Sequence, residues 1–183
     1  RFIPKRTVVG VVLAGVALST PALAWRHLFH VWDQADMPVP YYVAEVDSYG
    51  GKDMTYLKSV VQRGFEIWNE AAPCMDFHAE DMGPPPTDEK HPDQNIGYAN
   101  DLINRVTWDD PDNELVEPGI LAASRTISAG GTTIINGQEY KFATDGDIMY
   151  NENSAFATDE DIRDDNCQGR PSLVATTTHE IGH

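Results

Sequence analysis

The stretch that constrains the fold most strongly is residues 173–183, LVATTTHEIGH. Ser172 is a suitable N-cap, so a helix is expected from Leu173 to the end of this stretch. On such a helix His179 and His183 are separated by about 40° around the axis and about 6 Å along it. Both imidazole rings can therefore converge on one tetrahedral metal ion, for which zinc is the best candidate.

Glu180 lies between the two histidines and is rotated by about 100° from His179. Its carboxylate can face the fourth coordination position of a zinc ion, where a water molecule binds. Zinc lowers the pKa of that water to about 7, and Glu180 can take its proton as the water attacks a peptide carbonyl. The motif therefore predicts His179 and His183 as zinc ligands and Glu180 as the general base.

A catalytic zinc needs three protein ligands, and this motif supplies two. The chain has four further histidines: His27, His30, His78 and His91. They are scattered over expected loop and strand positions, where packing or surface roles are favoured. The chain begins with Arg1 and stops inside the motif, so we expect a fragment of a longer protein. The third ligand is expected beyond the chain end, and the fragment alone is expected to be inactive.

Upstream of the motif the sequence predicts one long helix. Asp53 is a plausible cap, and the apolar or small residues that follow recur at spacings of three and four: Leu57, Val60, Val61, Gly64, Phe65 and Trp68. This amphipathic helix is expected to end near Pro73. Phe65 and Trp68 are assigned to core packing.

Several strands are expected around this helix. They are predicted at residues 39–44, 75–79, 96–99, 105–108, 119–127, 132–135 and 147–150, with turns at Gly130-Gly131 and Gly137. The predicted fold is α+β, or α/β-like. It has a mixed twisted sheet, a long N-terminal helix and a C-terminal helix that carries the zinc motif.

Residues 1–24 have the three parts of a secretory signal peptide: a basic start, an apolar run at residues 8–18, and Ala22-Leu23-Ala24 before the cut. The apolar run is too short for a bilayer-spanning helix, which needs about 20 residues. We therefore expect a secreted protein, extracellular or periplasmic, without a membrane partner once the signal is removed.

The composition is strongly acidic, with 29 acidic and 13 basic residues and a net charge of −16. Removal of the signal takes away Arg1, Lys5 and Arg6, which leaves 10 basic against 29 acidic residues and a net charge of −19. Such a chain repels nucleic acid and has no basic stripe to follow phosphates, so no nucleic-acid partner is expected. A monomer is expected.

High acidity also fits calcium binding or a salty environment, and charge alone does not choose between them. Calcium prefers oxygen ligands. The candidate calcium ligands are Asp145, Asp147, Asp159 and Asp161, although acidic loops are more often only solvated.

Residues 175–183, ATTTHEIGH, resemble the active-site helix of the metzincin zinc proteases, particularly the matrixin-like ones. In that family the motif continues as HExxHxxGxxH, with a third histidine ligand and a later Met-turn. The resemblance implies that residues 25–183 are the N-terminal part of a metalloprotease catalytic domain. It assigns zinc binding to His179 and His183 and the general base to Glu180, and it makes Gly182 a small residue without a ligand role. The implied substrate is a protein or peptide.

The resemblance extends upstream. The helix with Phe65 and Trp68 is similar to the first long helix of the family, and residues 147–151 resemble one of its strands. Residues 119–123 resemble the sheet-edge strand that pairs with the substrate backbone, which implies substrate contacts at Leu121, Ala122 and Ala123. An exposed edge suits this task because its unpaired N–H and C=O groups can align an extended peptide.

Cys74 and Cys167 are the two cysteines of the chain. In an oxidising compartment they are most simply a disulfide. The alternative is a thiolate that caps the zinc and keeps the enzyme latent, but neither cysteine lies in a sequence like the latency motif of matrix metalloproteases.

Two other functions stay open from the sequence. One is a thermolysin-like zinc peptidase, in which the third ligand is a downstream Glu on a helix. The other is a secreted acidic module that binds calcium or has a structural role and does not catalyse a reaction.

Overall fold

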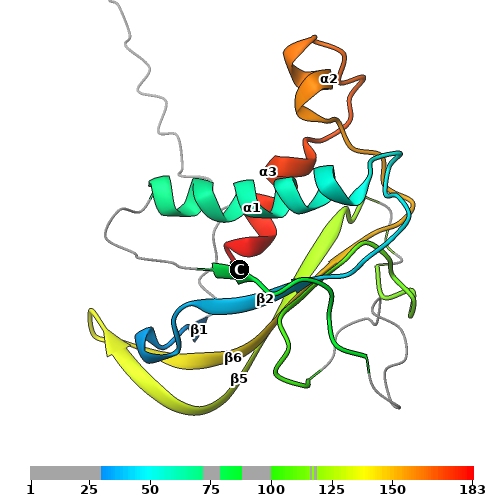
Figure 1. Cartoon of the computed structure of the whole chain (residues 1–183). Coiled ribbons are helices and arrows are strands. Elements are labelled where there is room, and N and C mark those ends of the chain that lie inside the picture. The colour runs from blue at the N-terminus through cyan, green and yellow to red at the C-terminus, as the bar shows by residue number, and fades with distance from the viewer. Residues whose placement is uncertain (1–29, 72–78, 88–99, 116, 118) are drawn as a thin grey trace, which may run out of the picture.

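The computed structural model describes residues 30–71, 79–87, 100–115, 117 and 119–183. The strands are β1 (His30–Val31), β2 (Val39–Val43), β3 (Ala79–Asp81), β4 (Arg105–Thr107), β5 (Ala122–Ile135) and β6 (Gln138–Tyr150). The helices are α1 (Met54–Ala71), α2 (Asp159–Arg163) and α3 (Leu173–Ile181), with a 3-10 turn at Gln34–Asp36. Figure 1 shows α1 and α3 on the same side of the sheet, with α2 projecting beyond them.

The sheet has six strands and is mostly parallel. Its order is β1-β6-β4-β2-β3, and every pairing along this path is parallel. β5 is the exception, because it runs antiparallel to β6 and pairs with no other described strand. The chain thus has a mixed α/β fold that is compatible with the predicted α+β class, and β5 forms one edge of the sheet.

α1 confirms the predicted long helix. The Asp53 carboxylate caps its first turn by accepting the Tyr56 backbone N–H at 2.9 Å. Its buried face carries Leu57, Val60, Val61 and Gly64. Leu57, Val60 and Val61 pack on the aromatic and β-branched residues of β2, β4 and β6 to form the main core. Full burial of a Val or Leu side chain contributes about 1.5–3 kcal/mol, so this face holds α1 on the sheet.

The predicted strands at 119–127, 132–135 and 147–150 are parts of one long hairpin, β5–β6. The Asn136-Gly137 turn joins the two strands, and both residues have positive φ, as a tight hairpin turn requires. The predicted turn at Gly130-Gly131 is wrong, since both glycines lie within β5. The pairing register shifts between Ser128 and Thr132, and Gly130 (φ 101°) supplies the backbone conformation for this irregularity.

The remaining strand predictions differ in extent or fall outside the described residues. β4 confirms the strand predicted at 105–108. The structure places β3 at 79–81, whereas residues 75–78 and 96–99 lie outside the described part of the chain. The predicted signal peptide also lies outside it. Among the described residues, no helix is long and apolar enough to cross a membrane.

Candidate functional site

α3 begins as its sequence predicts. The Ser172 hydroxyl accepts the Ala175 backbone N–H at 3.1 Å and so caps the first turn. Three successive threonines follow, and each donates its hydroxyl to the carbonyl four residues earlier, at 2.8–3.0 Å. Threonine is a weak helix former, and these side-chain bonds often bend a helix. α3 therefore depends on its packing partners more than on its own propensity.

The last turn of α3 is tighter than a regular α-helix. The helix ends at Ile181, two residues earlier than predicted, and Gly182 follows in an αR conformation. The Gly182 N–H is shared between the carbonyls of Thr178 (3.3 Å) and His179 (3.1 Å). The His183 N–H bonds to the Glu180 carbonyl at 3.2 Å, only three residues back. This 3-10 closure keeps His183 over the final turn although it lies outside the helix.

The two histidines of the motif meet in space. Their Nε2 atoms are 3.1 Å apart, and their rings are nearly perpendicular, with centroids separated by 4.7 Å. Two imidazole nitrogens bound to one tetrahedral zinc at 2.0–2.1 Å are separated by about 3.3 Å. The observed distance fits this requirement within a few tenths of an ångström. The nitrogen donors of His179 and His183 are thus suited to a shared zinc ion.

Glu180 lies on a different face of the same turn. It is 7% exposed, whereas His179 is exposed and His183 is partly exposed. Beneath it, the Tyr150 hydroxyl and the Thr177 hydroxyl form a buried hydrogen bond, and Thr177 also donates to the Leu173 carbonyl at 2.9 Å. Burial raises the pKa of Tyr150, and the nearby Glu180 carboxylate raises it further. Glu180 is therefore a buried carboxylate close to the Tyr150 hydroxyl, in the same turn as His179.

α1 contacts α3 at close range. The Trp68 indole N–H donates a hydrogen bond of 2.7 Å to the Thr178 carbonyl. At Gly64 the two helices are so close that an added Cβ would lie 2.7 Å from Ile181 Cδ1 and 3.3 Å from Thr177 Cγ2. The sequence assigned Trp68 to core packing and did not indicate this hydrogen bond. No local pattern could have indicated it, because the two residues are 110 positions apart.

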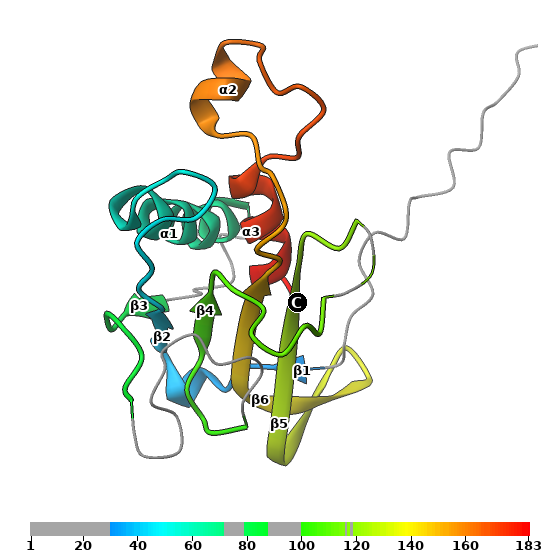
Figure 2. The ribbon, with the colours of Figure 1, turned by 90° about the vertical axis from the view of Figure 1, so that its right-hand side faces the viewer.

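The predicted substrate-contact segment lies at the start of the edge strand. Ala122 and Ala123 are the first residues of β5 and pair with Tyr150 and Met149 of β6. Leu121 precedes β5, and its carbonyl accepts the Asn151 N–H at 2.9 Å. The strand begins three residues later than predicted. α3 packs against β5, and Figure 2 shows the C-terminal end of α3 beside the edge strand and β6.

Asp145 and Asp147, the first pair of calcium candidates, accept backbone N–H groups. Asp145 is fully buried and its Oδ2 accepts the N–H groups of Asp101 and Leu102 at 3.1 and 3.2 Å. Asp147 Oδ1 accepts the Arg105 N–H at 3.1 Å. Burial raises the pKa of Asp145. These contacts give both carboxylates a role in fastening the segment before β4 to β6.

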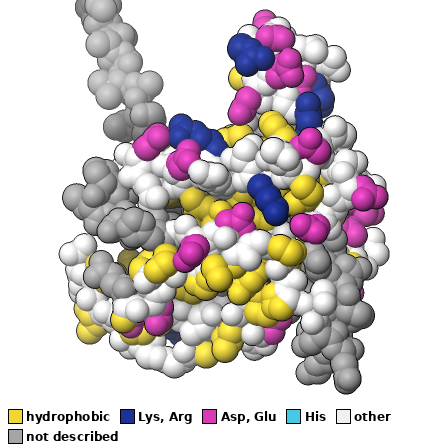
Figure 3. All heavy atoms as spheres, in the orientation of Figure 1, with side chains coloured by type: hydrophobic (Ala, Val, Ile, Leu, Met, Phe, Trp, Pro, Cys, Tyr) yellow, Lys and Arg dark blue, Asp and Glu magenta, His cyan; other side chains and the backbone are white. Residues whose placement is uncertain are grey.

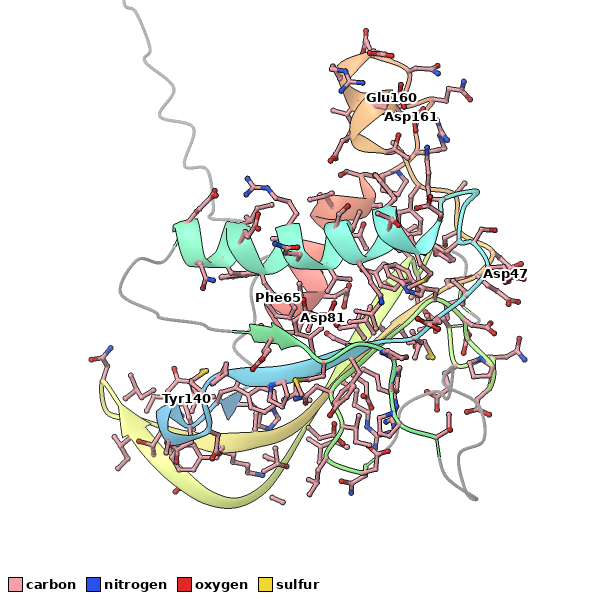
Figure 4. The ribbon with its side chains drawn as sticks, in the orientation of Figure 1. Asp47, Phe65, Asp81, Tyr140, Glu160 and Asp161 are labelled. Atoms are coloured by element: carbon pink, nitrogen blue, oxygen red, sulfur yellow. The ribbon has the colours of Figure 1, made fainter. Side chains whose placement is uncertain are left out.

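Asp159 and Asp161, the second pair, lie at the start of α2, for which the pattern predicts no helix. Asp161 accepts the N–H and hydroxyl of Thr158 at 2.8 and 2.9 Å, and Thr158 in turn caps α2. These bonds and the neighbouring Arg170 lower the pKa of Asp161. Figure 4 shows Asp161 and Glu160 on the projecting α2. The structure does not bring the two pairs together, and the described residues contain no group of three or more potential metal ligands.

The predicted disulfide lies partly outside the described part of the chain, because Cys74 does. Cys167 is partly exposed and has no disulfide partner among the described residues. Figure 3 shows Asp and Glu side chains spread over the visible face, with Lys and Arg side chains scattered among them.

The chain was also compared with known proteins. No protein-family model, no curated protein sequence and no solved structure matches it. The site must therefore be interpreted from its own geometry and chemistry.

Proposed function

We propose that this chain is the N-terminal part of the catalytic domain of a secreted, metzincin-type zinc endopeptidase. The observation that supports this proposal most directly is the 3.1 Å separation of the His179 and His183 Nε2 atoms. Glu180 lies between these two residues in the sequence, on the last turn of α3. His179 and His183 are two of the zinc ligands, and a third ligand follows His183. Substrate peptides are hydrolysed at this site.

When bound, zinc supplies Lewis-acid chemistry: it activates a water molecule and polarises the peptide carbonyl. Glu180 acts as the general base and takes a proton from the attacking water. It then delivers that proton to the leaving amine. The buried position of Glu180 supports this role, because burial restricts the orientations that the carboxylate can adopt.

The edge strand β5 is the proposed substrate platform. An extended peptide can add to a free strand edge through main-chain hydrogen bonds. β5 pairs with β6 alone among the described strands, and its first residues, Ala122 and Ala123, lie opposite Tyr150 and Met149. The Tyr150 hydroxyl bonds to Thr177 of α3. A peptide added to the start of β5 would therefore pair with a strand against which α3 packs.

Proteolysis by the full-length protein, including the residues after His183, tests this function. We expect cleavage of casein or of a peptide library, loss of activity with a zinc chelator, and recovery on adding zinc. Glu180→Gln preserves the size of the side chain but removes the base, so kcat should fall by about 10²- to 10⁴-fold with zinc still bound. Glu66→Gln, an exposed substitution on α1, is the control and should leave kcat unchanged.

Retention of full activity by Glu180→Gln, or the absence of any zinc-dependent cleavage, would show that the site is not a protease centre. Robust proteolysis by residues 25–183 alone would contradict the proposed third ligand after His183.

A further inference from the structure

The final turn of α3 depends on a contact from α1. Helix ends leave backbone carbonyls without intrahelical donors, and Thr178 carries one of the last carbonyls of α3. Its helical donor, the Gly182 N–H, is at 3.3 Å and is shared with the His179 carbonyl at 3.1 Å. The indole N–H of Trp68 is closer, at 2.7 Å. Trp68 thus supplies the shortest hydrogen bond to this carbonyl.

This hydrogen bond has a geometric consequence for the histidine pair. Because Trp68 satisfies the Thr178 carbonyl, the Gly182 N–H is able to move toward the His179 carbonyl. The next N–H, that of His183, likewise bonds three residues back, to Glu180. A 3-10 turn advances fewer residues per turn than an α-helix, which changes the position of His183 over His179. The 3.1 Å distance between the two Nε2 atoms is found with the last turn in this tightened conformation.

We propose that Trp68 is a positioning residue for the zinc ligands: its indole N–H sets the conformation of the last turn of α3 and thereby the spacing of His179 and His183. This inference rests on the proposed function. It extends the metal site to α1, a helix that contributes no ligand to the pair. Partners behind metal ligands typically change metal affinity by 10- to 100-fold when they are removed.

α1 is also held in place firmly enough for this role. The backbone at Gly64, one turn before Trp68, lies against Thr177 and Ile181, which flank Thr178. The same face of the helix packs into the main core through Leu57, Val60 and Val61. Trp68 therefore projects from a fixed helix, and its N–H cannot follow the last turn of α3 if that turn relaxes.

Trp68→Phe tests the inference, since it removes the N–H and keeps an aromatic ring. Trp108→Phe is the matched control: Trp108 is buried, but its Nε1 has no hydrogen-bond partner among the described residues. In the 183-residue chain, the first readout is amide hydrogen exchange. We expect exchange of the Gly182 and His183 amides to be about 10-fold faster in Trp68→Phe, while core amides of β6 keep their rates. Trp108→Phe should not change the ratio of these rates.

The second readout is zinc affinity, measured by competition with a chromophoric chelator. We expect about 10-fold weaker binding in Trp68→Phe than in the wild type and less than 2-fold in Trp108→Phe. Equal affinities and equal exchange in the two variants would overturn the inference and reduce Trp68 to core packing. If Trp68→Phe does not fold, benzothienylalanine at position 68 keeps the ring shape and removes only the donor, so the same comparison decides.

The two proposals fail in different ways. If the wild-type chain and the full-length protein bind no zinc, the proposed function is wrong. The exchange rates of Gly182 and His183 still decide whether Trp68 controls the last turn, because that measurement needs no metal. If zinc binds and cleavage occurs but Trp68→Phe changes neither readout, only the positioning role is wrong.

Discussion

At the scale of single residues, the pKa of Asp145 is under opposing influences from burial, hydrogen bonds and neighbouring charges. It is fully buried, and within the described part of the chain only one of its oxygens, Oδ2, has hydrogen-bond partners, the N–H groups of Asp101 and Leu102. Burial raises its pKa, and the nearby Asp101 adds to this rise. The two N–H bonds and Arg105 act in the opposite direction. The two N–H bonds favour the charged form of Asp145, and they connect the segment before β4 to β6.

Asp145→Asn should therefore change how stability depends on pH. A pKa raised by folding means that the folded state binds the proton more tightly than the unfolded state. Acidification through the folded-state pKa should stabilise the wild type relative to Asp145→Asn, by at most about 1.4 kcal/mol per pH unit. Urea unfolding at a series of pH values from 7 down to 3 measures this difference.

Asp161→Asn is the control with the opposite sign. The pKa of Asp161 is lowered by Thr158 and Arg170, so its stabilisation is present at neutral pH and is lost as the pH falls through the folded-state pKa. Parallel pH profiles for the two variants would contradict both assignments.

At the scale of elements, the crossing of α1 and α3 is the contact on which the site depends. Gly64 allows it, because an added Cβ would lie 2.7 Å from Ile181 Cδ1 and 3.3 Å from Thr177 Cγ2. Contacts this short force the neighbouring side chains to move. The two helices can approach this closely only because position 64 has no side chain.

Gly64→Leu should separate the helices. The expected destabilisation is about 1–3 kcal/mol, typical of overpacking, and zinc binding by the histidine pair should weaken as well. Arg63→Leu introduces the same side chain at the preceding position. Arg63 is exposed and forms salt bridges with Glu66 and Glu70. It should cost no more than about 1 kcal/mol. Equal unfolding free energies for the two variants in guanidinium titrations would argue against a tight crossing.

The elements also show where sequence patterns succeed. α1 and α3 were predicted with their caps, Asp53 and Ser172, because capping and apolar spacing are local signals. The β5–β6 hairpin was divided into short strands, because Gly130-Gly131 resembles a turn when read alone. Pairing across the hairpin tolerates these glycines as an irregularity within β5, and that pairing is not a local property.

At the scale of the whole molecule, charge repulsion opposes folding. The chain has a net charge of −16, and folding brings these charges closer together. Raising NaCl from about 10 to about 150 mM shortens the screening length from about 30 to about 8 Å. We expect the melting temperature to rise over this range.

Divalent salts at matched ionic strength separate screening from binding. MgCl2 and CaCl2 should have equal effects if only screening acts. A larger rise with CaCl2, removed by Asp145→Asn or Asp161→Asn, would support the calcium sites predicted from the sequence. A melting temperature that is independent of salt would contradict the repulsion argument.

By itself, the sequence determined helices α1 and α3, the acidic composition and the identity of the candidate zinc ligands and base, since each depends on spacing within a few residues or on composition. The sheet edge at β5 agrees with the strand that the resemblance implies at residues 119–123. The tertiary structure alone decided that Gly64 and Trp68 of α1 contact α3, and that the two Nε2 atoms lie 3.1 Å apart. These features join residues as much as 110 positions apart. Only packing brings such residues together, because no local pattern links one to the other.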